Sequence, residues 1–391
     1  MPSPIPTVEL ESDDLTRGPW IYARQVLEPR SEVLPGSLVE ILDRSGRFVG
    51  HGLYNPLSDI RLRVISRGRK SDLDQPRQFL LRRLAAADRL RKKLLRLPDR
   101  TDAYRVVHAE GDDLPGLVVD RLGDVLVCEY HSLGFYELQD EIAWALGQLY
   151  PEARLVHRVP QSVRRQEGFD PAEEAQDVGE VEVSEDGVRY RLLPGQGHKT
   201  GFFCDQRDNR ARVADFARDA TVLDLCCNVG GFALHAARAG ARRVRAVDLD
   251  EVVLERAAAS AAANGLEVEL RHADAFHVMR EEQGAGRQTQ VVVLDPHKIV
   301  RGKRQLEEGL TKYLDLNALA LGCVRPGGVL ATFSCSGAVE MADFAGVVFR
   351  AARRAGRELR VLEVLGAAPD HPQRPDFPRS RYLKGLLLAV D

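Results

Sequence analysis

The sequence contains little cysteine and no long apolar run. Six cysteines are spread over 391 residues and none is spaced as C-x-x-C, so neither a disulfide scaffold nor a zinc site of that type is expected. No apolar stretch approaches the roughly 18 residues of a membrane-spanning helix. The N-terminus lacks the basic start and apolar stretch of a secretory signal. These absences predict a reducing, cytoplasmic location with neither a membrane partner nor a metal.

The remaining composition is that of a folded protein. Hydrophobic residues make up 44% of the chain and charged residues 29%, which excludes extensive disorder. At about 150 residues per domain, the length allows two or three domains with separate cores.

The net charge of −3 is unevenly distributed. Between Arg61 and Arg100 there are 14 Lys or Arg against 4 Asp or Glu, an excess of +10, so the rest of the chain sums to −13. Such a block is typical of a surface that binds a polyanion such as nucleic acid. The alternative is the solvated face of an amphipathic helix, because leucines recur at helical spacing from Leu80 to Leu94.

The first 190 residues predict two small domains. Residues 1–70 contain short stretches of partial period-two alternation separated by turn residues, which predicts an all-β barrel or sandwich. Residues 71–190 predict a basic helix and a small α+β domain, in which the polar stretch 164–185 is a surface excursion. The expected strands are 20–22, 38–42, 48–54, 60–65, 104–109, 117–121, 125–130 and 154–158, and the expected helices are 75–97 and 135–149.

Residues 191–391 alternate between short apolar strands and helices, which predicts a mainly parallel α/β sheet covered on both faces. The expected strands are 221–225, 244–247, 268–272, 291–294 and 329–333, and the expected helices are 231–239, 251–264, 304–323 and 340–356. Four successive strands end at or near a carboxylate: Asp224, Asp248, Asp274 and Asp295. Ligands bind beyond the carboxyl ends of such strands, so these acids predict a pocket.

The loop after the first of these strands predicts a nucleotide site. Asn228 and Gly230 lie in a turn where glycine lets the backbone approach a ligand closely, and the next helix offers free N–H groups. The loop is not G-x-G-x-x-G, which argues against a dinucleotide. Asp224 would repel a phosphate but suits an ammonium group, and S-adenosylmethionine carries an ammonium and a carboxylate at that end.

The later acids fit the rest of S-adenosylmethionine. Asp248 lies 24 residues after Asp224, where a carboxylate can accept both ribose hydroxyls. Asp274 and Ala275 could receive the adenine amino group. A different adenosine cofactor, or a tight turn without a ligand, is the alternative.

The chain resembles the bacterial 23S rRNA cytosine-C5 methyltransferases that carry an N-terminal PUA domain. The resemblance spans nearly the whole chain and is carried by 20–22, 35–36, 48–52, 198–210 (HKTGFFCDQRDNR), 224–232 (DLCCNVGGF), 332–337 (TFSCSG), 370–372 and 382–385. It implies a Rossmann-like class I methyltransferase sheet, a PUA-like barrel and an RNA partner. It also implies that Phe203, Gln206 and Arg207 line the cofactor pocket, whereas from the residues alone 205–210 would be a solvated helix start.

Cysteine-dependent methylation needs a thiolate at the pocket mouth. Cytosine C5 attacks a methyl group only after a thiolate has added to C6, and a donor near N3 stabilises the adduct. Cys335 follows the strand at 329–333, beside Ser334 and Ser336, and is the candidate nucleophile. Asp295 is the candidate N3 partner, provided that it is protonated. A buried, inert cysteine is the alternative for Cys335.

One loop departs from the family pattern. Where the family has D-P-P-K-F, this chain has D-P-H-K-I, so His297 replaces a proline and Ile299 an aromatic residue. The lost proline leaves the loop freer, and the lost aromatic residue weakens stacking on the target base. His297 could contact the base in place of that aromatic residue. Lys298 could contact the nucleic-acid backbone. The departure puts the target, and even the activity, in question, but not cofactor binding.

The target base must be unpaired or flipped out, so the barrel and the basic block are expected to hold RNA through shape and phosphate contacts. PUA-like barrels can also serve as scaffold or as a dimer surface, which keeps a homodimer open. Two other functions also remain open: methylation of a different base position, such as an exocyclic nitrogen, and RNA binding or assembly without catalysis.

Overall fold

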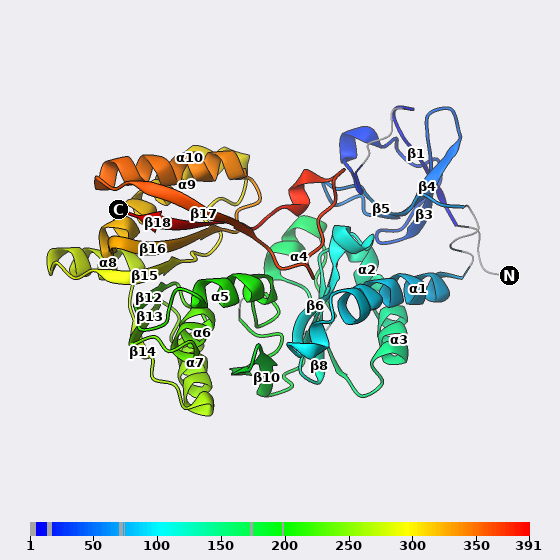
Figure 1. The fold of residues 1–391 in the computed structure, drawn as a ribbon. Coiled ribbons are helices and arrows are strands. Elements are labelled where there is room, and N and C mark those ends of the chain that lie inside the picture. Colours follow the sequence, from blue (N-terminus) through cyan, green and yellow to red (C-terminus); the bar gives the residue numbers. More distant parts are fainter. Residues whose placement is uncertain (1–4, 14–17, 70–72, 74, 173–174, 198) are drawn as a thin grey trace. The chain divides into compact units, whose positions relative to one another are not determined.

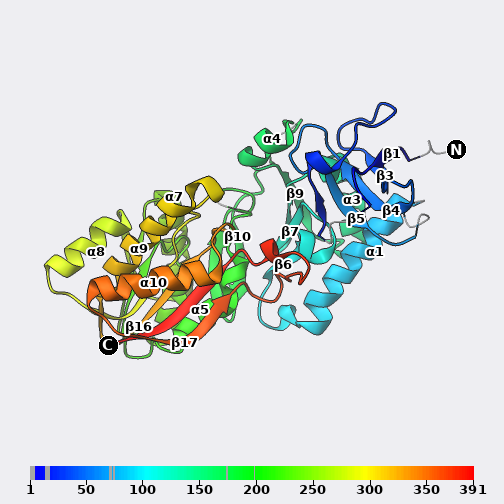
Figure 2. The same ribbon diagram turned by 90° about the horizontal axis from the view of Figure 1, so that it is seen from above.

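The computed structural model describes residues 5–13, 18–69, 73, 75–172, 175–197 and 199–391 (Figure 1, Figure 2). The chain forms two compact units. The first comprises Met1–Val181, Leu193–Phe202 and Pro369–Ser380, and the second comprises Glu182–Leu192, Phe203–Ala368 and Arg381–Asp391. Neither unit is a continuous piece of chain. His198, which opens one of the family segments, lies outside the described residues.

The first unit begins with a five-stranded sheet in the order β1-β3-β4-β5-β2. Its apolar core includes Val8, Ile21, Val39, Ile41 and Leu62. The four predicted strands are confirmed, and only the three-residue β1, too short to show a pattern, was not predicted. The strands are β1 (Thr7–Glu9), β2 (Trp20–Ile21), β3 (Leu38–Leu42), β4 (Phe48–Tyr54) and β5 (Leu62–Ser66).

A four-stranded sheet in the order β6-β7-β8-β9 follows, and helices α1 and α3 pack together over a shared apolar core. The predicted basic helix begins at Pro76 and changes to a π-helical turn at Leu90, and the predicted helix 135–149 is two helices that meet at Leu138. The elements are α1 (Pro76–Arg89), η3 (Leu90–Leu94), β6 (Ala103–His108), β7 (Leu117–Leu122), β8 (Val125–Tyr130), α2 (Leu133–Glu137), α3 (Gln139–Leu149), β9 (Arg154–Arg158) and α4 (Gln161–Glu167).

The prediction that residues 164–185 form a surface excursion is wrong at both ends of the stretch, whereas the described residues between Gly168 and Glu180 lie outside helices and strands and are mostly exposed. Glu167, at the end of α4, is 2% exposed, and its carboxylate accepts hydrogen bonds from Ser58 Oγ at 2.7 Å and Arg63 Nη2 at 2.8 Å. Residues Val181–Glu185 form β10, which pairs with β11 (Val188–Leu192). Polar residues are buried here because partners far away in the sequence satisfy them.

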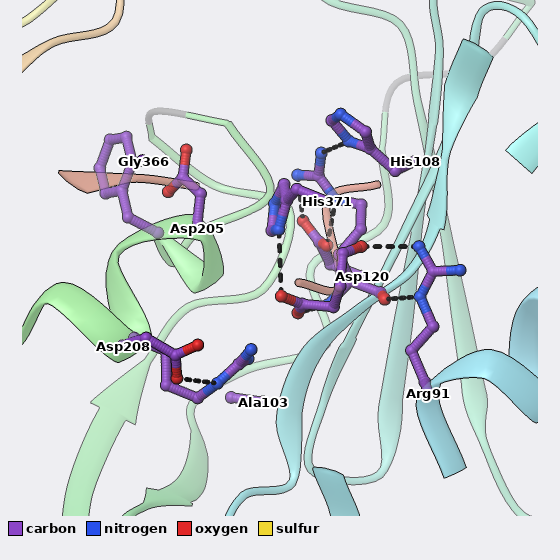
Figure 3. Close-up of polar contacts among 12 residues, drawn as sticks. Arg91, Ala103, His108, Asp120, Asp205, Asp208, Gly366 and His371 are labelled. Atoms are coloured by element: carbon purple, nitrogen blue, oxygen red, sulfur yellow. Dashed lines mark hydrogen bonds and ion pairs between the residues drawn. The ribbon is translucent and has the colours of Figure 1, made fainter. Parts of the chain in front are cut away.

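Part of the basic block is also structural. Arg91, which is labelled in Figure 3, is fully buried in the first unit. Its guanidinium donates to the Asp112 carboxylate at 2.6 and 2.8 Å and to the Asp370 carbonyl at 2.6 Å. The Asp370 carboxylate accepts from the Arg105 backbone N–H at 2.9 Å. Arg91 therefore ties the segment Pro369–Ser380 to the rest of the first unit and cannot face RNA.

The second unit is built on a seven-stranded sheet in the order β14-β13-β12-β15-β16-β18-β17. Strands β12 to β16 pair in parallel, and β18 runs antiparallel to both of its neighbours. The strands are β12 (Thr221–Leu225), β13 (Arg243–Asp248), β14 (Glu269–His272), β15 (Thr289–Leu294), β16 (Val324–Ser334), β17 (Leu359–Gly366) and β18 (Lys384–Val390). The five predicted parallel strands are confirmed, whereas the final antiparallel pair was not predicted.

Helices cover both faces of this sheet, as predicted (Figure 1). One apolar core lies under α8 to α10, and the other lies under α5 to α7. The helices are α5 (Arg207–Ala214), α6 (Gly231–Arg238), α7 (Glu251–Asn264), α8 (Ala275–Gly284), α9 (Leu306–Cys323) and α10 (Met341–Ala355). Short 3-10 turns are η1 (Ala23–Gln25), η4 (Leu97–Asp99), η5 (Ala109–Asp112), η6 (Cys204–Gln206), η7 (Lys303–Gln305) and η8 (Pro378–Ser380). No helix in the described part of the chain is long and apolar enough to cross a bilayer.

Replacing Arg91 by alanine is expected to lower the free energy of unfolding by about 3–5 kcal/mol, because it leaves buried acceptors without their partner. Arg96→Ala is the matched control, since the Arg96 side chain is 74% exposed and pairs with Asp99 at the surface. That pair contributes at most about 1 kcal/mol. Urea unfolding of both variants measures the difference, and equal losses would contradict the structural role of Arg91.

Candidate active site

The parallel strands of the large sheet bring their carboxyl ends to one edge. Asp224 lies in β12, Asp248 ends β13, Asp274 and Asp295 follow β14 and β15, and Cys335 follows β16. Burial raises the pKa of the Cys226 thiol, and the charges of all four carboxylates raise it further, so the four acids lie near one residue. The predicted cluster of acids at the sheet edge is therefore present.

The loop between β12 and α6 has an unusual backbone. Cys226, Asn228 and Gly230 have φ values of +63°, +50° and +79°. Residues with a Cβ rarely adopt this region, so the first two store strain at the site. At Gly230 a Cβ would lie 3.2 Å from the Cβ of Ala257, which leaves little room for a side chain. The Asn228 backbone N–H donates to Asp248 Oδ2 at 2.8 Å and ties the loop to the end of β13.

Asp224 is fully buried directly beneath this loop. Its Oδ2 accepts the Ala233 backbone N–H from α6 at 3.0 Å, whereas its buried Oδ1 has no hydrogen-bond partner in the described part of the chain. Burial, together with the charges of Asp295 and Asp248, raises the pKa of Asp224 to about 8. An unsatisfied buried carboxyl oxygen is a position where a ligand cation would be stabilised.

Asp248 and Asp274 offer acceptors further along the edge. Asp248 Oδ1 accepts the Asp250 backbone N–H at 3.1 Å, and a carboxylate has further lone pairs for hydroxyl groups. Asp274 caps α8 by accepting the His277 N–H at 3.1 Å. Ala275 is the first residue of α8, and its N–H has no acceptor within the helix. Such groups suit a ribose and an adenine ring.

The prediction from the residues alone that 205–210 is a solvated helix start is wrong. Four per cent or less of the surface is exposed for Asp205, Gln206, Arg207, Asn209 and Arg210. Gln206 Nε2 donates to Asp295 Oδ2 at 2.9 Å and thus lies at the sheet edge. The Tyr382 hydroxyl donates to Asp205 Oδ2 at 2.6 Å. The segment is buried because its charges find partners, as Arg210 does in Glu185 at 2.7 and 2.8 Å.

Phe203 and Arg207 flank this turn. Phe203 is half-buried just before η6, and its carbonyl accepts from Arg210 Nη1 at 3.1 Å. Arg207 is fully buried at the start of α5, where its Nε lies 3.6 Å from Asp208 Oδ1 (Figure 3). Among the three residues that the family resemblance assigns to the cofactor pocket, Gln206 contacts the predicted site residue Asp295 directly.

Cys335 is half-buried, and its Sγ lies 3.9 Å from the Pro296 carbonyl oxygen. The residue is therefore partly accessible to solvent. Four of the other cysteines are buried, including Cys128 and Cys323, which were predicted to serve packing, and Cys226 is half-buried. Cys335 and Cys226 thus both combine partial exposure with a place at the edge that holds the acids, and Cys335 is the one that follows β16.

A hydrogen-bond network fixes the turn that carries Cys335. Ser334 Oγ donates to the Tyr313 hydroxyl at 2.8 Å, and Ser336 Oγ lies 3.0 Å from the same hydroxyl. Ser336 Oγ also accepts the Val300 backbone N–H at 3.0 Å, which joins this turn to the loop after β15. Tyr313 was not predicted as a site residue, and the sequence showed only that it lies in the expected helix 304–323.

The loop that departs from the family pattern is exposed at its centre. His297 and Lys298 are both exposed, whereas Pro296 and Val300 on either side are buried. The anchored ends keep the loop beside Cys335, and the side chains of His297 and Lys298 remain accessible from solvent.

The site residues fit S-adenosylmethionine. Asp224 offers an unsatisfied acceptor suited to its ammonium, Asp248 offers acceptors for the ribose hydroxyls, and Ala275 offers a donor for the adenine ring.

Within the described ranges, no group of three or more His, Cys, Asp or Glu is arranged to hold a metal ion.

Asp224→Asn is expected to raise the melting temperature of the cofactor-free protein more at pH 8 than at pH 5. The pKa of Asp224 is raised in the folded chain, so the unfolded chain loses this proton first, and stability falls as pH rises from about 4 to 8. Asparagine cannot ionise and avoids this loss. Thermal unfolding of both proteins at the two pH values measures the effect, and a pH-independent difference would refute the raised pKa.

Comparison with known proteins places this site in a family. Residues 15–67 match a PUA-like domain, and residues 222–302 match a methyltransferase domain. Two solved structures share the fold at 19% identity and a TM-score of 0.81: a candidate methyltransferase complexed with SAH (98% of this chain, 99% of that chain), and a candidate SAM-dependent methyltransferase from Streptococcus mutans (99% and 100%).

Curated relatives are similar over almost the full length. The chain is 36% identical over 386 residues to a protein from Pseudoalteromonas atlantica and 38% identical over 391 residues to one from Aeromonas salmonicida, with 97% of each chain covered in both cases. Both relatives are named ribosomal RNA large subunit methyltransferase I. The chain belongs to this family of S-adenosylmethionine-dependent methyltransferases.

Proposed function

We propose that this enzyme methylates C5 of a cytosine in 23S rRNA through a covalent adduct on Cys335. The single observation that carries the proposal is the half-buried Cys335 thiol at the sheet edge that also holds Asp224, Asp248 and Asp295. Membership of a family whose relatives are named for large-subunit rRNA supports the RNA substrate.

The reaction divides one difficult step into easier ones. The Cys335 thiolate forms a bond to C6 of the cytosine, and the ring electrons shift to C5. When bound, the cofactor would supply the methyl group as an electrophile: C5 forms its bond to the methyl carbon as the methyl–sulfonium bond breaks, with that electron pair going to the cofactor sulfur. Loss of the C5 proton to a base then re-forms the C5–C6 double bond, and the C6–S bond breaks with its electron pair returning to sulfur.

Asp295 is the proposed partner of cytosine N3. Gln206 Nε2 donates to Asp295 Oδ2 at 2.9 Å, and Asn209 Nδ2 in turn donates to Gln206 Oε1 at 2.5 Å. This chain of hydrogen bonds fixes the orientation of the Asp295 carboxyl group. Asp295 would act in its protonated form, which can donate to N3 and stabilise the adduct.

His297 and Lys298 are the proposed substrate contacts. Both are exposed on the loop that follows Asp295, beside the turn that carries Cys335. His297 can donate to or stack on the flipped base, and Lys298 can neutralise a phosphate. Here His297 takes the place of the stacking residue that the loop lacks.

Cys335→Ala is expected to abolish methyl transfer to undermethylated ribosomal RNA, by at least about 10³-fold, while binding of S-adenosylmethionine persists. Cys128→Ala is the matched control, because Cys128 is a buried packing residue of the first unit. Labelled methyl groups on cytosine C5 that vanish only in Cys335→Ala support the proposal. RNA with 5-fluorocytosine at the target should also leave RNA covalently attached to Cys335, because fluorine cannot leave as a cation.

The two other functions give different outcomes in this experiment. Label on another base position that survives in Cys335→Ala would indicate a different methylation target. Cofactor binding without any transfer to RNA would indicate a non-catalytic RNA-binding or assembly protein. Either result would overturn the covalent mechanism.

Arg89→Gln combined with Lys93→Gln is expected to weaken RNA binding by removing phosphate contacts. Both side chains are exposed, unlike Arg91 between them. The slope of log K against log salt should become shallower by about 1.5–2. A salt titration of wild type and variant measures this, and an unchanged slope would contradict a phosphate grip by the basic block.

Three further expectations stay predictions. They are the homodimer, which a mass measurement in solution checks, the cytoplasmic location, and the division into domains at 1–70, 71–190 and 191–391.

A further inference from the structure

Lys384 lies beside the turn that carries Cys335. Strand β18 pairs antiparallel with β16 so that Lys384 stands opposite Ser334, the residue before Cys335. The Lys384 residue is 4% exposed. Its Nζ donates to the carbonyl of Ser336 at 2.6 Å and to that of Tyr382 at 2.7 Å. The Ser336 carbonyl therefore holds the ammonium at the residue that follows Cys335, and the Tyr382 carbonyl fixes it from its own segment.

The surroundings of this lysine are unusual for a buried cation. No carboxylate forms an ion pair with Lys384 in the part of the chain that the structure describes. Buried lysines are rare unless they are paired, because removing an ammonium from water is costly. Cys335 lies between Ser334, which stands opposite Lys384 in the sheet, and Ser336, whose carbonyl accepts from Lys384 Nζ, so a negative charge on its sulfur would lie close to this ammonium.

Burial lowers the pKa of Lys384 to about 8, and the charge of Cys335 partly opposes this effect while that of Lys298 adds to it. At pH 7 most of the Lys384 side chains therefore still carry a positive charge. The cation is thus present under the conditions in which a thiolate would be needed.

We propose that Lys384 is a positioning residue that stabilises the thiolate form of Cys335. The proposal rests on the proposed function, in which Cys335 is the nucleophile, and adds a residue to it. An adjacent cation favours the thiolate over the thiol. Lys384 acts twice: before the sulfur electron pair forms the bond to C6, and again when the C6–S bond breaks and that pair returns to sulfur. It transfers no proton and does not contact the base.

Alkylation of Cys335 by iodoacetamide between pH 5.5 and 9.5 tests this proposal, because only the thiolate reacts. Peptide mass spectrometry separates Cys335 from the other five cysteines. In Lys384→Met, the pH at half-maximal rate should move up by about one unit or more, so that alkylation at pH 7 falls about tenfold. Lys384→Arg should keep the wild-type profile, and Lys312→Met is the control for loss of an exposed lysine charge.

Lys384→Gln separates the electrostatic role from a structural one. Glutamine can donate hydrogen bonds to the two carbonyls but carries no charge, so the proposal expects its alkylation profile to match that of Lys384→Met. A wild-type profile in both neutral variants, with cofactor binding intact, would overturn the proposal. If Lys384→Met does not fold, the comparison of Lys384→Gln with Lys384→Arg decides in the same way.

The readout is independent of methyl transfer. If Cys335→Ala still methylates RNA, the proposed function fails, whereas the alkylation profiles still show whether Lys384 acts on the thiol. If transfer requires Cys335 but the profiles do not move, the proposed function stands and the role of Lys384 is refuted.

Discussion

The alignment of parallel strands is the constraint on which the site depends. Five neighbouring strands run in one direction, so residues far apart in the sequence end at one edge of the sheet. Four of them bring a carboxyl group there, and this concentration of acid raises the pKa of Asp224 beyond what burial alone would do. Backbone N–H groups from Ala233 and Asn228 offset part of this repulsion. The remaining acceptors suit a ligand that brings a positive charge.

The spacing of apolar residues predicted most of the strands and helices. The limits of β12 and α7 match the apolar spacing of the sequence closely, because a buried parallel strand and an amphipathic helix are determined by their own residues. Asp248 and Asp274 were predicted as site residues for the same reason, since Asp248 is the last residue of a strand and Asp274 lies just beyond one. The prediction failed at β17 and β18, whose place in the sheet depends on pairing with β16.

Buried polar residues were the least predictable. Arg91 belongs to a basic stretch that resembles a solvated face, and its burial depends on Asp370, which lies 279 residues away. Glu167 likewise depends on Arg63, and Lys384 on a turn that only strand pairing brings near. Whether a charged side chain can be buried depends on its hydrogen-bond and ion-pair partners. A single sequence does not reveal partners that lie far away along the chain. The family resemblance directed attention to Gln206, which the structure shows to be buried and bonded to Asp295, and its role in the cofactor pocket stays a prediction.

The segments exchanged between the two units have a consequence for how such a protein can be recombined. The hairpin of β10 and β11 supplies Glu185, which is fully buried against Arg210 and His235 of the second unit. After the hairpin, the chain returns to the first unit at Leu193. The segment Pro369–Ser380 interrupts the second unit and belongs to the first. A chimaera made by one crossover would thus combine ionic partners from different parents. We therefore expect an exchange of either unit between relatives to keep these partners matched only when all three of its segments come from the same parent.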